Sequence, residues 1–287
     1  MAHGTPDSLD DMPEYLRLVR GGRLPTPELI AEMRRNYGAI GGKSPLTAMT
    51  LAQADALRAR LGPGVPVAVG MRNWRPFIAA AIADLVSGGA ERVIAIPLAP
   101  QFSSVSVQKY FDAASSSLAD GVQLERIQSF AAHPRLLDAF AERVQQARPT
   151  ADEHIVFTAH SVPERVVAAG DPYIDEVRTT ARGIAERVAR SDYSIAFQSA
   201  GRTPEPWVGP DVNEFIRSAA ADGRTKLLIV PVGFVCDHTE ILFDIDVQAA
   251  ATARERGVTL RRTESLNSSP AFIDVLEDLV REKTDGH

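Results

Sequence analysis

The chain has 287 residues, a length that suits two domains or one large α/β domain. Hydrophobic residues make up 45% and charged residues 24%, which excludes intrinsic disorder, and a net charge of −6 argues against a nucleic-acid partner. The single cysteine, Cys236, excludes an intramolecular disulfide and any iron–sulfur cluster held by several thiolates of this chain.

Short apolar runs alternate with helical patterns along the chain, which is typical of βα units and parallel sheets. In chain order, the predicted elements are helix 27–35, helix 46–61, strand 65–70, helix 76–86, strand 92–98, strand 122–127, helix 134–147, strand 155–159, helix 174–190, strand 193–198, helix 211–221, strand 226–232, helix 240–256, strand 258–262 and helix 271–283. We therefore expect two open parallel sheets, one in a domain over 1–149 and one in a domain over 150–287. No apolar run of about 18 residues predicts a transmembrane segment, and no secretory signal is visible.

Ligands of open parallel sheets bind beyond the carboxyl ends of the strands, so the residues after each strand are the candidates for chemistry. His160 follows the predicted strand 155–159 directly and is followed by a turn that contains Pro163. On residue type alone, a histidine hydrogen-bonded to a loop backbone is the more frequent case. Its position nevertheless makes His160 a candidate site residue.

The segment after strand 226–232 has two interpretations. Asp237 and Glu240 have the spacing of a variant capping box, which the residues alone favour. Glu240, Asp244 and Gln248 also recur at i, i+4 and i+8, a polar line that protons or a divalent cation would use. His238 and Glu240 lack the spacing of a helical zinc pair, so a transient metal site fits better than a permanent one.

The sequence gives little support for a cysteine nucleophile, a serine hydrolase or a phosphate-binding loop. Cys236 is expected to be a small packed residue rather than a nucleophile. Ser44 and Ser161 are not in a Gly-x-Ser-x-Gly elbow, which argues against a hydrolase. The glycines of 39–46 lack the phosphate-loop spacing and predict a turn into the next helix.

Taken together, eight motifs in order along the chain resemble the ferrochelatase family, most closely the short, cluster-free bacterial form that acts on coproporphyrin. They are Met1-Ala2-His3-Gly4-Thr5-Pro6, Ala39-Ile40-Gly41-Gly42-Lys43-Ser44-Pro45-Leu46, Leu98-Ala99-Pro100-Gln101-Phe102-Ser103, Thr158-Ala159-His160-Ser161-Val162-Pro163, Gly170-Asp171-Pro172-Tyr173, Phe197-Gln198-Ser199, Trp207-Val208-Gly209-Pro210 and the run from Val230 to Glu240. The resemblance implies an α/β chelatase-like fold with two Rossmann-like lobes, each with a parallel sheet, and a porphyrin cleft between them. It also implies that the C-terminal helix, 270–284, packs back on the N-terminal lobe.

The resemblance implies a role for particular residues. His160 and Glu240 match the metal-site histidine and its partner glutamate, and Asp244 matches a catalytic acidic residue on the same helix face. Residues that match positions holding the porphyrin carboxylates are Arg20, Tyr37, Ser44, Ser103 and Tyr110.

Four positions depart from the family pattern. His3 stands where the coproporphyrin enzymes usually have a tyrosine close to the metal, and imidazole is also an iron ligand. Asn73 replaces a histidine, Gly21 replaces an arginine and Gln248 replaces a glutamate. We expect these changes to affect porphyrin binding and metal entry.

The resulting hypothesis is a cytoplasmic ferrochelatase that inserts Fe2+ into coproporphyrin III to give coprohaem. Iron is then a substrate, and neither an iron–sulfur cluster nor an organic cofactor is expected; a downstream haem-pathway enzyme is a candidate partner. The alternatives are a protoporphyrin IX ferrochelatase, a sirohydrochlorin-type chelatase and a non-catalytic tetrapyrrole carrier. Family members usually run an apolar strand into the equivalent of Met1, so we also expect a truncated start and an unfinished first sheet.

Overall fold

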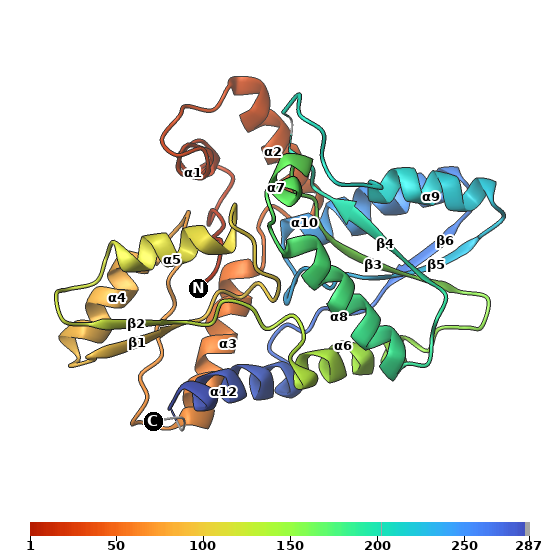
Figure 1. Cartoon of the computed structure of the whole chain (residues 1–287). Helices are drawn as coiled ribbons and strands as arrows, with labels where there is room; N and C mark the ends of the chain where they lie inside the picture. Colours follow the sequence, from red (N-terminus) through yellow and green to blue (C-terminus); the bar gives the residue numbers. More distant parts are fainter. Residues whose placement is uncertain (202, 285–287) are drawn as a thin grey trace.

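The computed structural model describes residues 1–201 and 203–284, which form two parallel sheets flanked by helices (Figure 1). The larger sheet has the order β4-β3-β5-β6, and the smaller sheet pairs β1 with β2. The strands are β1 (Arg92–Ala95), β2 (Gln123–Arg126), β3 (His154–His160), β4 (Tyr193–Gln198), β5 (Lys226–Val230) and β6 (Thr259–Arg262). The parallel pairing confirms the predicted α/β class.

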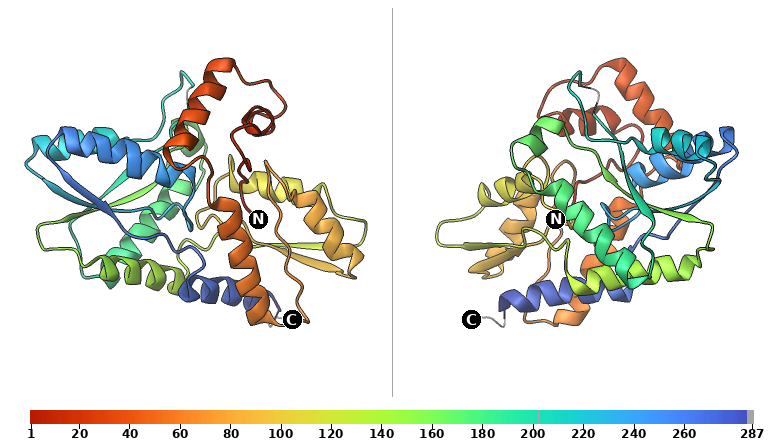
Figure 2. Two further views of the ribbon diagram at one scale, coloured as in Figure 1. Left: turned by 180° about the vertical axis from the view of Figure 1, so that it is seen from behind. Right: turned by 45° about the vertical axis from the view of Figure 1, so that its right-hand side comes forward.

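Helices cover the sheets, and α1 and α2 stand apart from them at the top of the molecule in Figure 1 and in both turned views of Figure 2. The helices are α1 (Met12–Val19), α2 (Pro27–Ala39), α3 (Leu46–Leu61), α4 (Ile78–Ser87), α5 (Val107–Ser115), α6 (Pro134–Ala147), α7 (Glu164–Ala168), α8 (Tyr173–Arg187), α9 (Val212–Ala221), α10 (Thr239–Leu242), α11 (Ala250–Glu255) and α12 (Pro270–Thr284), with a π-helical segment η1 (Asp244–Ala249) between α10 and α11. No helix within 1–201 and 203–284 is both long and apolar enough to cross a membrane.

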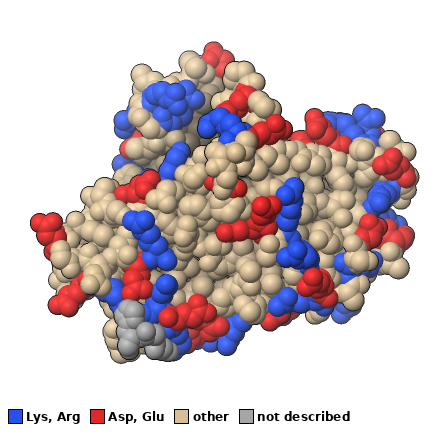
Figure 3. Space-filling model, in the orientation of Figure 1, with Lys and Arg blue, Asp and Glu red and all other residues tan. Residues whose placement is uncertain are grey.

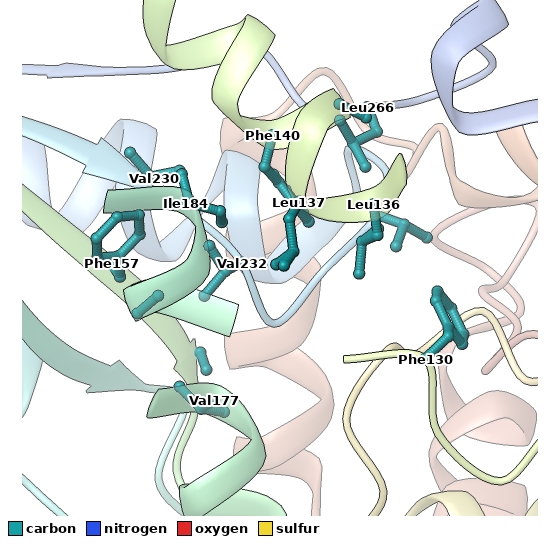
Figure 4. Close-up of a cluster of buried hydrophobic side chains, with 14 of the residues drawn as sticks. Phe130, Leu136, Leu137, Phe140, Phe157, Val177, Ile184, Val230, Val232 and Leu266 are labelled. Atoms are coloured by element: carbon teal, nitrogen blue, oxygen red, sulfur yellow. The ribbon is translucent and has the colours of Figure 1, made fainter. Parts of the chain in front are cut away.

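The larger sheet is covered on both faces, and its central strands β3 and β5 are buried at every position except the exposed Lys226 and the half-buried His160. In β3, Ile155, Phe157 and Ala159 belong to the apolar core that includes α6 and α8, whereas Val156 belongs to the core under α9 and α11. This split follows from the alternation of side chains along a strand. Figure 4 shows Phe157 near Ile184 of α8.

The N-terminal and C-terminal halves share one core through α3 and α12. Leu57 of α3 lies in the same apolar cluster as Leu276 of α12. The amide of Gln53, a buried side chain in α3, donates to the carbonyl oxygen of Asn267 at 2.8 Å. On the surface, acidic and basic side chains are interspersed over the face shown in Figure 3.

Two elements differ from the sequence prediction. Residues 65–70 do not form a strand, because they pair with a neighbour only at their end, through the bridge between Ala2 and Met71. The helix predicted over 240–256 is not continuous, because η1 interrupts it between α10 and α11. Helices α1, α5 and α7 are not among the predicted elements, and they contain only eight, nine and five residues.

Candidate active site

Strand β3 places His160 at its carboxyl end, opposite Gln198 of β4. The imidazole is 37% exposed, whereas the strand residues before it are buried. Its Nδ1 lies 2.5 Å from the carbonyl oxygen of Ser161. Because a carbonyl only accepts, Nδ1 carries the proton of this hydrogen bond. His160 therefore directs its other ring nitrogen, Nε2, toward Glu240.

The Glu240 carboxylate lies between two imidazoles. Its Oε1 is 3.9 Å from Nε2 of His160, and its Oε2 is 3.8 Å from Nε2 of His238. His238 also donates through Nδ1 to a backbone carbonyl, that of Cys236, at 3.1 Å. Gln198 donates to the Glu240 carbonyl oxygen at 2.6 Å. Both rings are thus held with Nε2 directed at one carboxylate.

Glu240 and Asp244 have pKa shifts in opposite directions. Burial favours a higher pKa for Glu240, but the imidazoles of His160, His238 and His3 outweigh it and lower that pKa to about 2. Burial raises the pKa of Asp244 to about 6, and the Glu240 charge adds to the effect. Ser199 donates a hydrogen bond to the Asp244 carboxylate. Glu240 therefore stays ionised, while Asp244 changes protonation state close to neutral pH.

The capping-box interpretation of Asp237 is wrong. The cap of α10 is His238, which makes no side-chain capping bond. Asp237 instead accepts from Ser265 at 2.8 Å and Asn267 at 3.0 Å, and it pairs with Arg262 at 3.0 Å. Asp237 therefore anchors the loop that carries His238 and Glu240.

The predicted polar line does not continue to Gln248. The backbone N–H groups of Val247 and Gln248 both bond to the carbonyl oxygen of Phe243, which widens the helix into η1. A π-helical turn contains more residues than an α-helical turn, so the i, i+4, i+8 alignment of a regular helix does not apply. Gln248 is exposed, and Asp244 is half-buried.

His3, from the N-terminal half, has both ring nitrogens in hydrogen bonds. Nδ1 lies 3.1 Å from the Gly4 carbonyl oxygen and 3.3 Å from the Tyr15 hydroxyl, so this nitrogen carries the proton. Nε2 lies 2.9 Å from the Asn73 amide nitrogen and accepts from it. Burial and the charge of Arg72 lower the pKa of His3 to about 4, so the ring is neutral at pH 7. Metal ligation through Nε2 would require Asn73 to move away.

The charge of Glu240 acts on three tyrosines in helices of the N-terminal half. Burial raises the pKa of Tyr15, of Tyr37 and of Tyr110, the last to about 12, and the Glu240 charge contributes in each case. The Tyr37 hydroxyl also lies 3.0 Å from that of Thr5. Three neutral hydroxyl groups, from α1, α2 and α5, therefore lie within the electrostatic reach of Glu240.

The other residues predicted to contact the substrate differ in whether they already have hydrogen-bond partners within the protein. Ser44 is buried beside α3, where its hydroxyl accepts from Leu46 N at 3.4 Å. The Ser103 hydroxyl donates to Asp171 at 3.3 Å. In contrast, the buried Nε of Arg20 has no hydrogen-bond partner among the described residues. Arg20 thus offers a free donor, whereas both serines already have partners within the protein.

Several residues of the site were not singled out from the sequence. The sequence assigns His238 no role of its own, although it lies two residues before Glu240. Ser199 directly follows β4, so the strand-end rule that found His160 also applies to it. Tyr15 gave no signal, because α1 was not predicted. Within residues 1–201 and 203–284, no three His, Cys, Asp or Glu side chains form a group that could hold a metal ion.

Comparison with known proteins assigns the chain to a family. The family model described as Ferrochelatase matches residues 1–284. The chain belongs to the ferrochelatase family. A ferrochelatase from Herpetosiphon aurantiacus is 40% identical over 98% of this chain and 96% of its own length. The coproporphyrin III ferrochelatase of Geobacillus sp. is 37% identical, over 98% and 95% respectively.

Solved structures support the chelatase fold. SirB from Bacillus subtilis, solved with Fe3+, has a TM-score of 0.61 and 17% identity, and the match covers 83% of this chain and 92% of that one. CbiX, described as the terminal enzyme for siroheme biosynthesis in denitrifying bacteria, has a TM-score of 0.55 and 15% identity, with 98% and 96% covered. Ferrochelatases are lyases that insert a metal ion into a porphyrin, and Fe2+ is the substrate metal that the family implies.

Proposed function

We propose that the chain inserts ferrous iron into coproporphyrin III, and that His160 and Glu240 handle the metal and the protons. The observation that carries the assignment of the site is the ionised Glu240 carboxylate between the Nε2 atoms of His160 and His238. Relatives named coproporphyrin III ferrochelatase support this choice of substrate, alongside relatives named ferrochelatase alone.

The reaction releases two protons for each iron ion inserted. Fe2+ must lose bound water, and the two pyrrole N–H groups must lose their protons. The free Nε2 of His160 accepts a proton or transfers the borderline-soft metal. Asp244 accepts a proton more readily than an ordinary carboxylate, because its pKa is about 6, and it releases that proton to water near pH 7. We therefore assign His160 and Asp244 as the groups that accept the protons, and the ionised Glu240 as the charge that stabilises the protonated imidazole.

We assign binding of the porphyrin propionates to residues of the N-terminal half. Coproporphyrin III carries four propionates, which need charged or hydroxyl donors. The unpartnered Nε of Arg20 is one such donor, and Tyr37 and Tyr110 supply hydroxyls. We include Ser44 and Ser103 on condition that substrate replaces their present hydrogen bonds. His3 is assigned to the metal from the side opposite His160.

An anaerobic Fe2+ titration followed by absorption spectra tests this function. Coproporphyrin III, protoporphyrin IX and sirohydrochlorin are offered separately, and fastest metalation of coproporphyrin III is the expected result. Faster metalation of protoporphyrin IX or sirohydrochlorin would overturn the substrate assignment. Binding without metalation would instead indicate a tetrapyrrole carrier. A cytoplasmic location and a downstream haem-pathway partner stay predictions.

A further inference from the structure

The Gly-Asp-Pro-Tyr motif at 170–173 forms the turn between α7 and α8, and the carboxylate of Asp171 connects the two halves of the molecule. Oδ2 accepts from the backbone N–H of Ser104 at 2.6 Å, from the Ser104 hydroxyl at 2.6 Å and from the Ser103 hydroxyl at 3.3 Å. Oδ1 accepts from the backbone N–H of Tyr173, the first residue of α8, at 3.0 Å. Each carboxylate oxygen of Asp171 is thus bonded to a different half.

The N-terminal side of this connection is the segment 102–104, which leads into α5. Besides the bonds to Asp171, the backbone N–H of Phe102 donates to Glu176, in the first turn of α8, at 2.6 Å. The hydroxyl of Ser129 donates to the same oxygen of Glu176 at 2.7 Å. In Figure 1, the segment that leads into α5 reaches the start of α8. Segment 102–104 therefore rests on two carboxylates at the N-terminal end of α8, where the helix dipole favours negative charge.

Segment 102–104 also sets the position of α5. The carbonyl oxygen of the buried Ser103 accepts from Ser106 N at 3.3 Å and from Gln108 N at 3.1 Å, and these bonds form the start of the helix. Tyr110 lies in α5. Ser103 and Tyr110 are both assigned to the porphyrin propionates, so a shift of segment 102–104 would shift the surface on which the porphyrin rests.

The C-terminal side of the connection leads from Tyr173 to the metal-site histidine. The Tyr173 side chain is buried in the core that β3 shares with α6 and α8, and its hydroxyl is hydrogen-bonded to the backbone of His160. Burial raises the pKa of Tyr173, and the Glu240 charge adds to the rise, so the hydroxyl is neutral. His160 is therefore supported by the residue whose backbone Asp171 holds.

We propose that Asp171 is a positioning residue for metalation, which holds segment 102–104 and the support of His160 at a fixed separation. The porphyrin bound by the N-terminal half would then present its ring centre to Nε2 of His160. This inference rests on the proposed function for the porphyrin contacts of Ser103 and Tyr110. Asp171 acts through its partners, and its effect on rate follows from alignment, because a misplacement of about 1 Å can slow a reaction about a hundredfold.

An amide cannot replace this carboxylate. All the groups that bond to Asp171 are donors, whereas asparagine offers one acceptor oxygen and one NH2 donor. If the amide oxygen of Asp171→Asn faces Ser104, its NH2 group faces the N–H of Tyr173, and the opposite orientation places NH2 against the donors of Ser104. The variant therefore keeps the volume of the side chain and loses the connection on one side.

Single-turnover kinetics test the proposal. The full chain is loaded with the porphyrin that it metalates fastest and is mixed anaerobically with Fe2+, and absorption gives the rate constant. Asp171→Asn is expected to lower this rate constant at least about tenfold and to change porphyrin affinity less than about threefold. The matched control is Asp175→Asn, because Asp175 also lies in the first turn of α8 but pairs with Arg178 of the same helix at 2.9 Å. The control is expected to react at the wild-type rate.

Two comparisons separate positioning from a general loss of structure. Unfolded chains would lower the amplitude of the reaction and leave its rate constant unchanged, and that result would overturn the proposal. Tyr173→Phe removes the hydroxyl bonded to the His160 backbone, so Asp171→Asn and Tyr173→Phe act on one connection. The double variant is expected to lose less than the product of the two single losses, and a full product would show that Asp171 acts independently of His160. Ser104→Ala, the milder variant, is expected to slow the reaction about threefold.

Amide hydrogen exchange tests the connection without porphyrin or iron. Asp171→Asn is expected to speed exchange at the amides of Ser104 and Tyr173 at least about tenfold, and Asp175→Asn is expected to change neither. Unchanged exchange at both amides in Asp171→Asn would overturn the proposal. Faster metalation of a different porphyrin by the wild-type chain would overturn the coproporphyrin assignment alone, because each variant is compared with the wild type on the same porphyrin.

Discussion

Replacing Asp237 by alanine tests whether this side chain holds the loop that carries the metal-site residues. The carboxylate accepts from Ser265 and Asn267 and pairs with Arg262. The Asp237 side chain is 23% exposed and that of Arg262 is 16% exposed, so solvent replaces the lost contacts only in part.

The expected loss of unfolding free energy is about 2–3 kcal/mol. Hydrogen bonds to a charged group contribute about 1.5–3 kcal/mol each and are not additive. Breaking a buried ion pair costs about 3–5 kcal/mol when the remaining charge has no other partner. Arg262 keeps two hydrogen bonds to Asp246, at 2.7 and 3.0 Å, so its charge retains a partner in the variant. The expected loss of unfolding free energy therefore lies below the cost of a fully broken buried ion pair.

Urea unfolding with an unchanged m-value measures the loss, and Asp246→Ala is the matched control. Asp246 also pairs with Arg262, but it is 38% exposed, so its removal is expected to cost about 1 kcal/mol or less. Steady-state kinetics of Asp237→Ala should show a lower kcat with an unchanged KM for porphyrin, because Glu240 loses its position. Equal losses in the two variants, or a change below about 0.5 kcal/mol in Asp237→Ala, would refute the anchoring role.

Four further predictions concern the strand ends and the carboxyl groups. His160→Ala should abolish metalation in an anaerobic spectrophotometric assay while porphyrin binding persists, and near-normal turnover would contradict its role. Glu240→Gln should lower kcat more than porphyrin affinity, because it removes the charge between the two imidazoles; unchanged turnover would count against the site. Asp244 is protonated below its pKa of about 6 and accepts protons only above it, so kcat should rise with pH through that value. Asp244→Asn should remove this rise, and a rise that persists would assign it to another group. Gly233→Ala should cost about 1–3 kcal/mol in unfolding measurements, because the added Cβ would lie 2.8 Å from the Cα of Ala159; wild-type stability would show that the strand shifts freely.

The sequence was most informative where apolar runs and strand ends determine the structure. The predicted helix 46–61 has the observed bounds of α3, and His160 lies at the end of β3 as expected. Both features depend on local periodicity and on the rule that sites lie beyond the carboxyl ends of parallel strands.

Features that depend on distant contacts were not predictable from the sequence. Asp237 has the spacing of a capping residue, yet its partners Ser265 and Asn267 lie about thirty positions further along the chain. The regular pattern over 240–256 gives no sign of the π-helical turn in η1. Residues 65–70 have the composition of a strand, but a strand also requires a neighbour along its length.

The hydrogen bond from Gln53 to Asn267 connects the two halves mechanically. Asn267 supports Asp237, and Asp237 supports the loop that ends at Glu240, so α3 is linked to Glu240 through a chain of short polar contacts. A displacement of α3 against the larger sheet must break the bond to Asn267 or carry that loop with it. The position of the carboxylate that faces the two imidazoles is thereby coupled to the relative position of the two halves of the molecule.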